Sequence, residues 1–375
     1  NKTTGRSNMK LTEKIPWLMG RLQRTLFPCL EQCCTTPLTK QEQHLVKVLE
    51  IIEIECHVPK NRQWTGRPPA ERKASARSYV AKALFRYPHT RDLIHELQAR
   101  PNLRLICGFP QSQRLPSESI FSRAFAEFAV QGLGRVVHDG MVESYLKKEL
   151  IGHVSRDSTA IAEREKAAKK GKVLKVARKR GRPAKGKQRP PKELTRLDKQ
   201  LNQEAAMAIS ELPTVCNRGI KKNSKGYLQS WTGFKLHADV NDTMLPLSVV
   251  LTSASVHDSQ VAIPLIKLTS AKVDYCYDLM DVAYDATQIR ELSQTLGHVA
   301  IIDRNSRNGE VVPMSPHEAK RYNERSSCER FNGRLKEEFG GRQVMVRGPD
   351  KVMMHLMFGV VALFADQLLK VTGYS

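Results

Sequence analysis

The chain has 375 residues, and its 61 Lys and Arg side chains against 38 Asp and Glu give a formal net charge of +23. With 40% hydrophobic and 26% charged residues, the composition excludes wholesale disorder, a collagen-like repeat and a low-complexity protein. The length suggests about two or three domains, and the positive charge indicates a polyanion as partner.

The cysteines and the apolar segments favour neither a disulfide framework, nor a zinc site, nor a membrane anchor. Eight cysteines are far below the density of a disulfide scaffold, and no Cys-x-x-Cys pair offers zinc ligands. Residues 1–10 lead into no apolar run typical of a secretory signal. The most apolar stretch, 352–364, is shorter than the roughly 20 residues that span a bilayer, so we expect a buried helix. Nucleic acid is therefore the expected partner, and no membrane.

Residues 11–150 are expected to be helical. Apolar side chains recur at helical spacing in 45–54, in 79–87 before Pro88, and in 121–128. The three Phe residues of 121–128 fall on one helix face, which favours packing in the core over stacking on bases.

A basic segment, 100–109, lies between two of these expected helices. It contains Pro101 and Gly108, which favour a turn. Helices joined by a basic turn are consistent with DNA binding. We therefore predict a helical N-terminal DNA-binding domain over 1–150.

About half of the excess charge lies in one short segment. Residues 163–199 hold sixteen Lys or Arg against four acidic residues, a net charge of +12. Three prolines and the lack of apolar periodicity exclude a regular helix or strand in its middle and predict a mobile basic arm. The sequence Arg180-Gly-Arg182-Pro resembles an AT-hook, which places arginines in the narrow minor groove of A/T-rich DNA. A solvated loop that binds phosphates without sequence preference explains the same residues equally well.

From Gly152 onward the pattern changes from helices to strands that alternate with helices. The expected elements are strands at 154–161, 234–240 and 247–251, a helix opened by Asp258, a strand at 274–280, a helix at 286–296, a strand at 299–303 and a long helix from Ser315. This is the order of the RNase H-like fold, an α/β fold with a mixed sheet flanked by helices. We assign 151–162 and 216–375 to such a catalytic domain, and 163–215 to a basic insertion between its first two strands.

Three acidic residues fall where this fold would assemble a metal site. Asp157 lies in the first strand, Asp281 follows the fourth strand, and Glu329 lies on the long helix. Phosphodiester cleavage uses such a cluster because Mg²⁺ and Mn²⁺ prefer oxygen ligands, and two ions can activate the attacking group and neutralise the leaving oxygen. Singly, each carboxylate would more simply be a helix cap or a surface charge, so it is their joint placement that indicates the site.

The long helix also carries two cations and a tyrosine on the side of Glu329. Tyr322, Arg325, Glu329 and Lys336 fall within an arc of about 60°, at about 100° per residue. An ordinary surface helix with mixed charges is the simpler alternative. Gly333 costs about 1 kcal/mol in a helix interior and indicates close packing. The neighbouring face is apolar and is expected to dock on the sheet; it carries Cys328, Phe331, Leu335 and Phe339.

These residues carry a family resemblance. Tyr322-x2-Arg325-x3-Glu329-x6-Lys336 is similar to the signature of DDE transposases from bacterial insertion sequences, in the insertion-sequence-four-like group. The resemblance is strong over 152–336 and looser over the helices before it. Other segments that resemble the group are Asp157-Ser-Thr, Asp281-Val-Ala-Tyr284, the stretch from Gly219 through Trp231 to His237, and Ala254-Ser-Val-His257-Asp258.

The resemblance implies a transposase. Such an enzyme binds the terminal inverted repeats of its element, cleaves the ends with a divalent metal, and transfers the freed 3′-hydroxyl to target DNA. The implied cofactor is Mg²⁺, as two ions, with Mn²⁺ able to substitute; the implied partner is double-stranded DNA, and a homodimer is expected because two ends are handled together. The implied location is the bacterial cytoplasm, at the nucleoid when bound to DNA.

The resemblance also implies roles for single residues. Asp157, Asp281 and Glu329 would bind the metals, and Arg325 and Lys336 would hold phosphates with Tyr322 alongside. Only 48 positions separate Asp281 from Glu329, so hairpin formation by the large β-rich insertion of some relatives is not assumed.

Some alternatives stay open at this point. Lys222, Lys225 and Trp231 are candidate DNA contacts, but a core residue of an edge strand is the slightly favoured interpretation of Trp231. His257 and Asp258 could join the site, although Asp258 as a helix N-cap is the simpler interpretation. A transposase-derived protein that binds DNA without cutting it, or an RNase H-like nuclease for branched DNA, would share most of these features.

Overall fold

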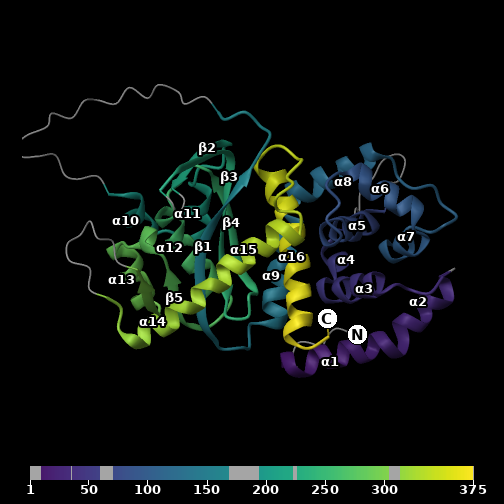
Figure 1. Cartoon of the computed structure of the whole chain (residues 1–375), viewed down its shortest axis with the longest axis horizontal. Coiled ribbons are helices and arrows are strands. Elements are labelled where there is room, and N and C mark those ends of the chain that lie inside the picture. The colour runs from purple at the N-terminus through teal and green to yellow at the C-terminus, as the bar shows by residue number, and fades with distance from the viewer. Residues whose placement is uncertain are drawn as a thin grey trace, which may run out of the picture.

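The computed structural model describes residues 10–34, 36–59, 71–168, 194–222, 226–303 and 313–374. Figure 1 shows a mixed sheet flanked by helices in one half of the molecule and a group of helices in the other, with α16 between the halves. The predicted arm around Arg180 and Arg182, and Lys225, lie outside the described residues.

The N-terminal part is helical, as its apolar periodicity predicts. Phe121, Phe125 and Phe128 are buried, which confirms their assignment to the core. A π-helical turn, η2 (Leu22–Leu26), joins the first two helices. The helices are α1 (Leu11–Arg21), α2 (Phe27–Cys33), α3 (Lys40–Ile52), α4 (Ile54–His57), α5 (Arg72–Leu84), α6 (Thr90–Ala99), α7 (Pro101–Cys107), α8 (Glu118–Gln131) and α9 (Leu133–Tyr145).

The prediction of a turn at 100–109 is wrong, because these residues form α7. Pro101 takes the first helical position and Gly108 follows the helix with φ 94°. Both residues are common at these two positions, since proline is preorganised for a helix start and glycine adopts the left-handed conformation without strain. The basic Arg100 ion-pairs with Glu42 at 3.2 Å, so it also serves the packing of the helices.

The sheet confirms the predicted strands and adds one that the sequence did not indicate. Its order is β2-β3-β1-β5-β6, with β4 also paired to β3. β1 pairs antiparallel with β3 and parallel with β5, so it lies in the middle of the sheet. The strands are β1 (Ile151–Ala162), β2 (Asn217–Lys222), β3 (Leu228–Asn241), β4 (Pro246–Ser253), β5 (Tyr275–Met280) and β6 (Val299–Ile302).

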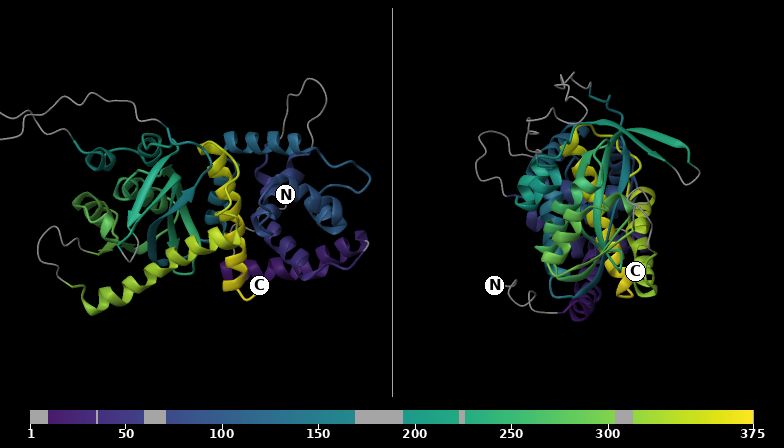
Figure 2. Two further views of the ribbon diagram at one scale, coloured as in Figure 1. Left: turned by 45° about the horizontal axis from the view of Figure 1, so that its top comes forward. Right: turned by 90° about the vertical axis from the view of Figure 1, so that its left-hand side faces the viewer.

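β2 and the start of β3 form a hairpin that projects from the body of the molecule, as the right-hand view of Figure 2 shows. This hairpin contains the segment from Gly219 that was expected only to lead into a strand. Ile220 and Leu228, from its two strands, are exposed.

Helices cover both faces of the sheet. One face holds α10 (Arg196–Leu201), α11 (Ala205–Ser210), α12 (Ser259–Ser270) and α13 (Thr287–Thr295), with a 3-10 turn η3 (Val282–Tyr284) before α13. The other face holds α14 (Pro316–Tyr322), the 3-10 turn η5 (Asn323–Arg325) and α15 (Ser326–Glu338). α10 and α11 fall within the segment predicted as a basic insertion, and both pack on α12.

Two neighbouring residues of β1 show how the faces differ. Successive side chains of a strand point to opposite faces. Arg156 contacts Asp239, which in turn accepts a hydrogen bond from Thr269 of α12. Asp157 therefore points to the other face, where α15 packs against β1 and β3.

The last helix, α16 (Pro349–Val371), joins the two halves. It packs against α3, α5, α8 and α9, and also against α15 and β4. Among the described helices it is the one long and apolar enough to cross a membrane by length and composition, with mean hydropathy 1.8 over a window that is 89% buried. The prediction of a buried helix over 352–364 is confirmed.

Candidate active site

Asp157 and Asp281 lie side by side on the sheet. β1 and β5 are parallel, with Ser155 opposite Leu279, and each aspartate is two residues farther along its strand direction. Parallel neighbours in register share a face, so both carboxylates lie on the face that α15 covers. Asp281 directly follows β5 and caps η3, because its Oδ1 accepts a hydrogen bond from the Ala283 amide at 2.9 Å.

The surroundings disfavour negative charge on both carboxylates. Burial, with a contribution from Asp281, raises the pKa of Asp157 to about 6, against the opposing effects of the Ser158 amide and Arg325. Burial also raises the pKa of Asp281, helped by the charge of Asp258. Two carboxylates that are partly desolvated and close together favour a bound cation, which would stabilise their ionised forms.

Arg325 links these aspartates to the third predicted carboxylate. Its guanidinium donates a hydrogen bond to Glu329 at 2.5 Å and lies 3.8 Å from Asp281 Oδ2. It also lies over the Tyr322 ring, 6.0 Å from its centre. The structure thus brings Asp157, Asp281, Tyr322, Arg325 and Glu329 together at one place.

The helix that carries the signature residues is not regular throughout, as their predicted arc assumed. The 3-10 turn η5 separates α14 from α15, so Tyr322 and Arg325 do not follow the spacing of a single α-helix. Arg325 still reaches Glu329, because Arg325 is the N-cap of α15 and Glu329 lies four residues later, on the first turn.

Glu329 does not face the aspartates directly. Its side chain is 57% exposed, against 33% for Asp281, and its ion pair is with Arg325. In the described part of the chain no group of three or more His, Cys, Asp or Glu is close enough to hold a metal ion. The donors that do meet are carboxylate oxygens, the ligands that Mg²⁺ and Mn²⁺ prefer, so their chemistry fits such an ion once Glu329 leaves Arg325.

Lys336 and Lys221 add positive charge to the site. Burial and the charges of Arg342 and Lys221 lower the pKa of Lys336, while Asp157 acts in the opposite direction. Lys221 also affects the pKa of both Asp157 and Asp281. Sequence reasoning singled out Lys222, whereas Lys221 is the hairpin lysine whose charge acts on the two aspartates.

Trp231 is held within the hairpin. Its indole N–H donates to the Phe234 carbonyl at 3.1 Å, and its ring lies over Gly219, where an added Cβ would come within 2.4 Å of the ring. Gly219 is opposite Trp231 in the β2–β3 register. This packing fits the structural interpretation of Trp231, whereas Lys222 belongs to β2 and its side chain is not described.

Asp258 does not cap its helix, so that interpretation is wrong. It occupies the N-cap position of α12 without a side-chain capping bond. Its Oδ1 instead accepts hydrogen bonds from Lys235 Nζ and the Ser158 hydroxyl, both at 2.9 Å. Although burial alone would raise the pKa of Asp258, His237 and Lys235 hold it below its usual value. His257 is exposed and bonds to Ser259.

Tyr284 is a site residue whose part sequence reasoning did not recognise. Its side chain is 1% exposed, and among the described residues its hydroxyl has no hydrogen-bond partner. Burial raises its pKa well above the usual value, with further contributions from Asp258, Asp157 and Asp281. The tyrosine hydroxyl therefore lies among the acidic residues, and the Asp281-x-x-Tyr284 spacing was the available signal.

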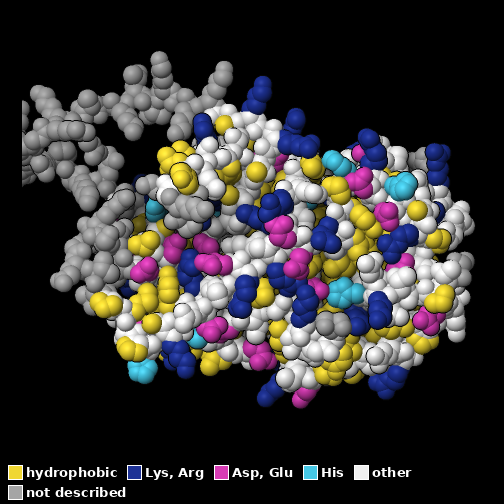
Figure 3. Space-filling model, in the orientation of Figure 1, with side chains coloured by type: hydrophobic (Ala, Val, Ile, Leu, Met, Phe, Trp, Pro, Cys, Tyr) yellow, Lys and Arg dark blue, Asp and Glu magenta, His cyan; other side chains and the backbone are white. Residues whose placement is uncertain are grey.

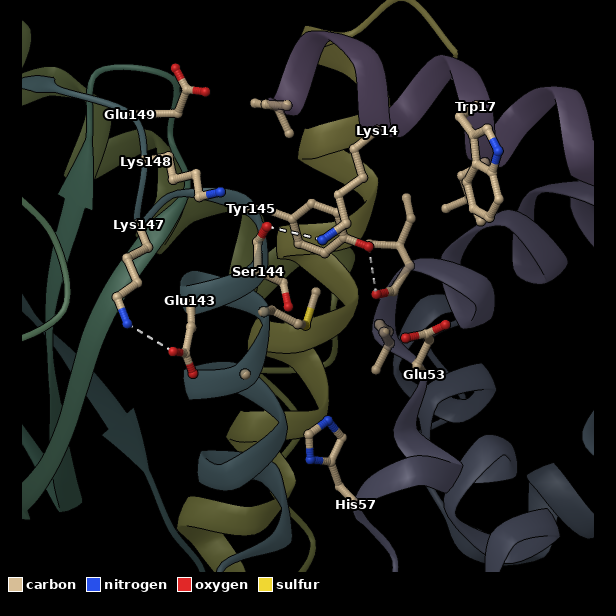
Figure 4. Close-up of a pocket in the computed structure, with 16 residues that line it drawn as sticks. Lys14, Trp17, Glu53, His57, Glu143, Ser144, Tyr145, Lys147, Lys148 and Glu149 are labelled. Atoms are coloured by element: carbon tan, nitrogen blue, oxygen red, sulfur yellow. Dashed lines mark hydrogen bonds and ion pairs between the residues drawn. The ribbon is translucent and has the colours of Figure 1, made fainter. Parts of the chain in front are cut away.

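One pocket of the described structure lies away from these carboxylates. Its volume is about 600 Å³, and it is lined by α1, the end of α3, and α9 (Figure 4). Lys14 extends across it and donates a hydrogen bond to the Ser144 carbonyl. Charged side chains of both signs are interspersed over the face in Figure 3. What distinguishes the acidic site is the burial of Asp157 and Asp281 and their proximity.

Two transposase family models match the chain. The model of the transposase DDE domain matches residues 210–365, which include Asp281 and Glu329 but not Asp157. A second transposase domain model, DUF772, matches residues 35–127 within the N-terminal helices. No curated protein and no solved structure matches the chain. Together, the two family matches support a DDE transposase of an insertion sequence.

Proposed function

We propose that the protein binds the terminal inverted repeats of an insertion sequence, cleaves the element ends and joins them to target DNA. One observation carries this proposal: Asp157 and Asp281 lie side by side on adjacent parallel strands, and Arg325 pairs with both Asp281 and Glu329. Phosphodiester cleavage by divalent metals needs such converging carboxylates.

The strand arrangement supports the proposal of an RNase H-like catalytic unit, and the signature residues support its assignment to the insertion-sequence-four-like group. β1, β3 and β4 are antiparallel neighbours, and β5 and β6 follow as parallel strands with helices between them. We retain the proposed division into a helical N-terminal DNA-binding domain (1–150), the catalytic unit (151–162 and 216–375) and a basic insertion (163–215).

Asp157, Asp281 and Glu329 would hold two Mg²⁺ ions, or Mn²⁺ in their place. When bound, the ions supply activation of the attacking water or 3′-hydroxyl and neutralise charge on the leaving oxygen. Glu329 would exchange its contact with Arg325 for the metal. This exchange would leave the Arg325 guanidinium available for a DNA phosphate.

Arg325 has further capacity for such a contact. Its Nε is buried and has no hydrogen-bond partner among the residues described. An unsatisfied guanidinium donor beside a cleavage site favours a phosphate oxygen. Lys336 and Tyr322 would hold the same strand, with Lys221 on the hairpin side.

Contacts farther from the cleavage site are also part of the proposal. Lys222, Lys225 and Trp231 on the β2–β3 hairpin, and Arg180 and Arg182 of the basic arm, would bind the surrounding double-stranded DNA. A homodimer would hold the two element ends together, and we propose that it acts in the bacterial cytoplasm, at the nucleoid.

A cleavage assay tests the proposal. Purified protein and a duplex carrying the element end should give strand cleavage in Mg²⁺ or Mn²⁺, and cleavage should fall by at least about a hundredfold in Asp157→Asn, Asp281→Asn and Glu329→Gln. Glu324→Gln is the matched control, because Glu324 is exposed on the same helical stretch and is not among the proposed metal ligands. Cleavage that survives in all three variants would overturn the assignment.

A transposase-derived protein that binds DNA without cutting it is the second candidate. The separation of Glu329 from the aspartates and its ion pair with Arg325 favour it. The same assay separates the two, because binding of end DNA without metal-dependent cleavage is expected only of the second candidate.

A further inference from the structure

A second basic region lies between the N-terminal helices and the catalytic half, away from the carboxylates. It is a cleft of about 510 Å³ formed by α5, α8, the segment after β1 and the segment before α16. The cations that line it are Lys82, Arg86, Arg164, Arg347 and Lys351, and the carboxylate in its lining is Glu118. Glu118 lies 3.7 Å from Arg91, so it does not neutralise this group.

Four of these cations form no ion pair in the described structure. Arg86, Arg164, Arg347 and Lys351 are exposed, and none of them has a salt bridge with a described carboxylate. The charge of Arg347 does act on Glu163, where it opposes the rise in pKa that burial causes. Unpaired cations around one concave surface repel one another, and an anionic ligand would relieve that repulsion.

Lys82 lies at the base of the cleft with only 9% of its surface exposed. Its ammonium donates a hydrogen bond to the Pro88 carbonyl at 3.1 Å and forms no ion pair with a described carboxylate. A buried ammonium without a carboxylate partner is costly. The neighbouring His355 imidazole is uncharged at neutral pH, because burial lowers its pKa to about 4.

The backbone of Arg86 provides an independent indication. α5 ends with hydrogen bonds from the Tyr87 amide to the Lys82 carbonyl and from the Arg86 amide to the Ala83 carbonyl. This is the pattern in which the residue after the C-cap is usually glycine. Arg86 occupies that position with φ 60°, at a cost of about 1 kcal/mol relative to glycine. The chain thus keeps an arginine where the local structure favours glycine.

We propose that this cleft binds the phosphate backbone of double-stranded DNA, as a contact separate from the cleavage site. This inference rests on the proposed function. The cleft joins the two parts that match transposase domains, since Lys82 and Arg86 lie in one match and Arg347 and Lys351 in the other. The strongly basic segment 163–199 also begins at its edge, with Arg164.

The position of Arg164 relates the cleft to the cleavage site. Arg164 is seven residues after Asp157, so the two are at most about 23 Å apart along an extended strand. Phosphates follow one another at about 3.4 Å along one DNA strand. DNA that occupies both places would therefore contact the cleft within roughly seven nucleotides of the cleaved bond.

The experiment measures binding of a fluorescent end duplex by anisotropy at several salt concentrations. Arg86→Gly combined with Lys351→Ala should remove about two phosphate contacts and reduce the slope of log affinity against log salt by roughly 1.8. Lys10→Ala combined with Arg135→Ala is the control, because it removes the same charge from exposed residues outside the cleft. The control should keep the wild-type slope.

Stability and cleavage distinguish the possible failures. Arg86→Gly should leave the unfolding midpoint equal to or above that of the wild type, since glycine relieves the left-handed backbone, so weaker binding cannot be attributed to unfolding. If the wild type cleaves end DNA but the cleft variant binds like the control, the cleft proposal is wrong and the transposase proposal stands. If the wild type neither binds nor cleaves end DNA, the proposed function itself fails.

Discussion

Replacement of Arg156 by methionine should destabilise the sheet that carries Asp157. Arg156 is fully buried and ion-pairs with Asp239 at 2.6 Å and Asp278 at 3.1 Å, and both aspartates are fully buried as well. Thr269 and Ser293 donate further hydrogen bonds to these carboxylates. The arginine therefore joins β1 to its neighbours β3 and β5 from the face opposite to Asp157.

The expected loss in the free energy of unfolding is about 3 to 5 kcal/mol at neutral pH, because the variant leaves two buried carboxylates without their cation. In the wild type, burial raises the pKa of Asp239 against the effect of Arg156. At Asp278 burial would raise the pKa, but the charge of Arg156 together with hydrogen bonds from His298 and Ser293 lowers it. Without Arg156 both pKa values should rise, so the carboxyls take up protons in the folded state as the pH falls. The deficit should therefore shrink from pH 8 to pH 5.

Urea unfolding of both proteins across this pH range measures the deficit. Arg218→Met is the control, because Arg218 is exposed on β2 and donates to the Ser230 hydroxyl; it should change stability by less than about 0.5 kcal/mol. Addition of Asp239→Asn and Asp278→Asn to Arg156→Met should recover part of the loss. A deficit below about 1 kcal/mol, or one that grows as the pH falls, would refute the reasoning.

Three further predictions concern single residues. An added Cβ at Gly333 meets no described atom within 4 Å, so the close packing expected of this glycine is wrong. Gly333→Ala should therefore stabilise α15 by up to about 1 kcal/mol. Cleavage should nevertheless fall, since the methyl group lies on the side of Glu329 and Lys336, where the proposed DNA strand would pass. Urea unfolding and the end-cleavage assay would show both, and unchanged cleavage would contradict a DNA contact there. Burial lowers the pKa of His237 to about 4, so on acidification the unfolded state binds a proton at this residue before the folded state does, and the free energy of unfolding should fall from about pH 6.5 to pH 4. His237→Gln should reduce this pH dependence in unfolding titrations. The same pH dependence in the variant and the wild type would contradict the prediction. Trp231→Ala should lower the free energy of unfolding by about 1 to 2 kcal/mol, because the ring would no longer pack on Gly219. A loss of DNA affinity without a change in the free energy of unfolding would instead indicate that Trp231 stacks on DNA bases.

The central strands and the adjacency of the two aspartates follow from the sequence. Alternating apolar residues predict β1, β3 and β4, and parallel pairing of β1 with β5 puts Asp157 and Asp281 on one face. These features are predictable because they depend on local periodicity and on a general property of sheets.

The remaining features depend on contacts between distant residues. β2 is polar and basic, so no apolar alternation marks it, and it forms because Gly219 accommodates the ring of Trp231. Asp258 has the position of a helix cap, but Lys235 and Ser158 from neighbouring strands bind its carboxylate instead. The sequence did not predict α7, because Pro101 and Gly108 are typical of turns as well as of helix ends.

Direct coordination of the metal by Asp157 and Asp281 is the central claim, and a change of ligand softness tests it most directly. Cysteine at either position would replace a hard oxygen ligand by a soft sulfur, which disfavours Mg²⁺ more than Mn²⁺. Asp157→Cys and Asp281→Cys should lose end cleavage in Mg²⁺ and regain part of it in Mn²⁺, whereas alanine at the same positions should regain none. Wild-type cleavage rates in Mg²⁺ for the two cysteine variants would contradict the account.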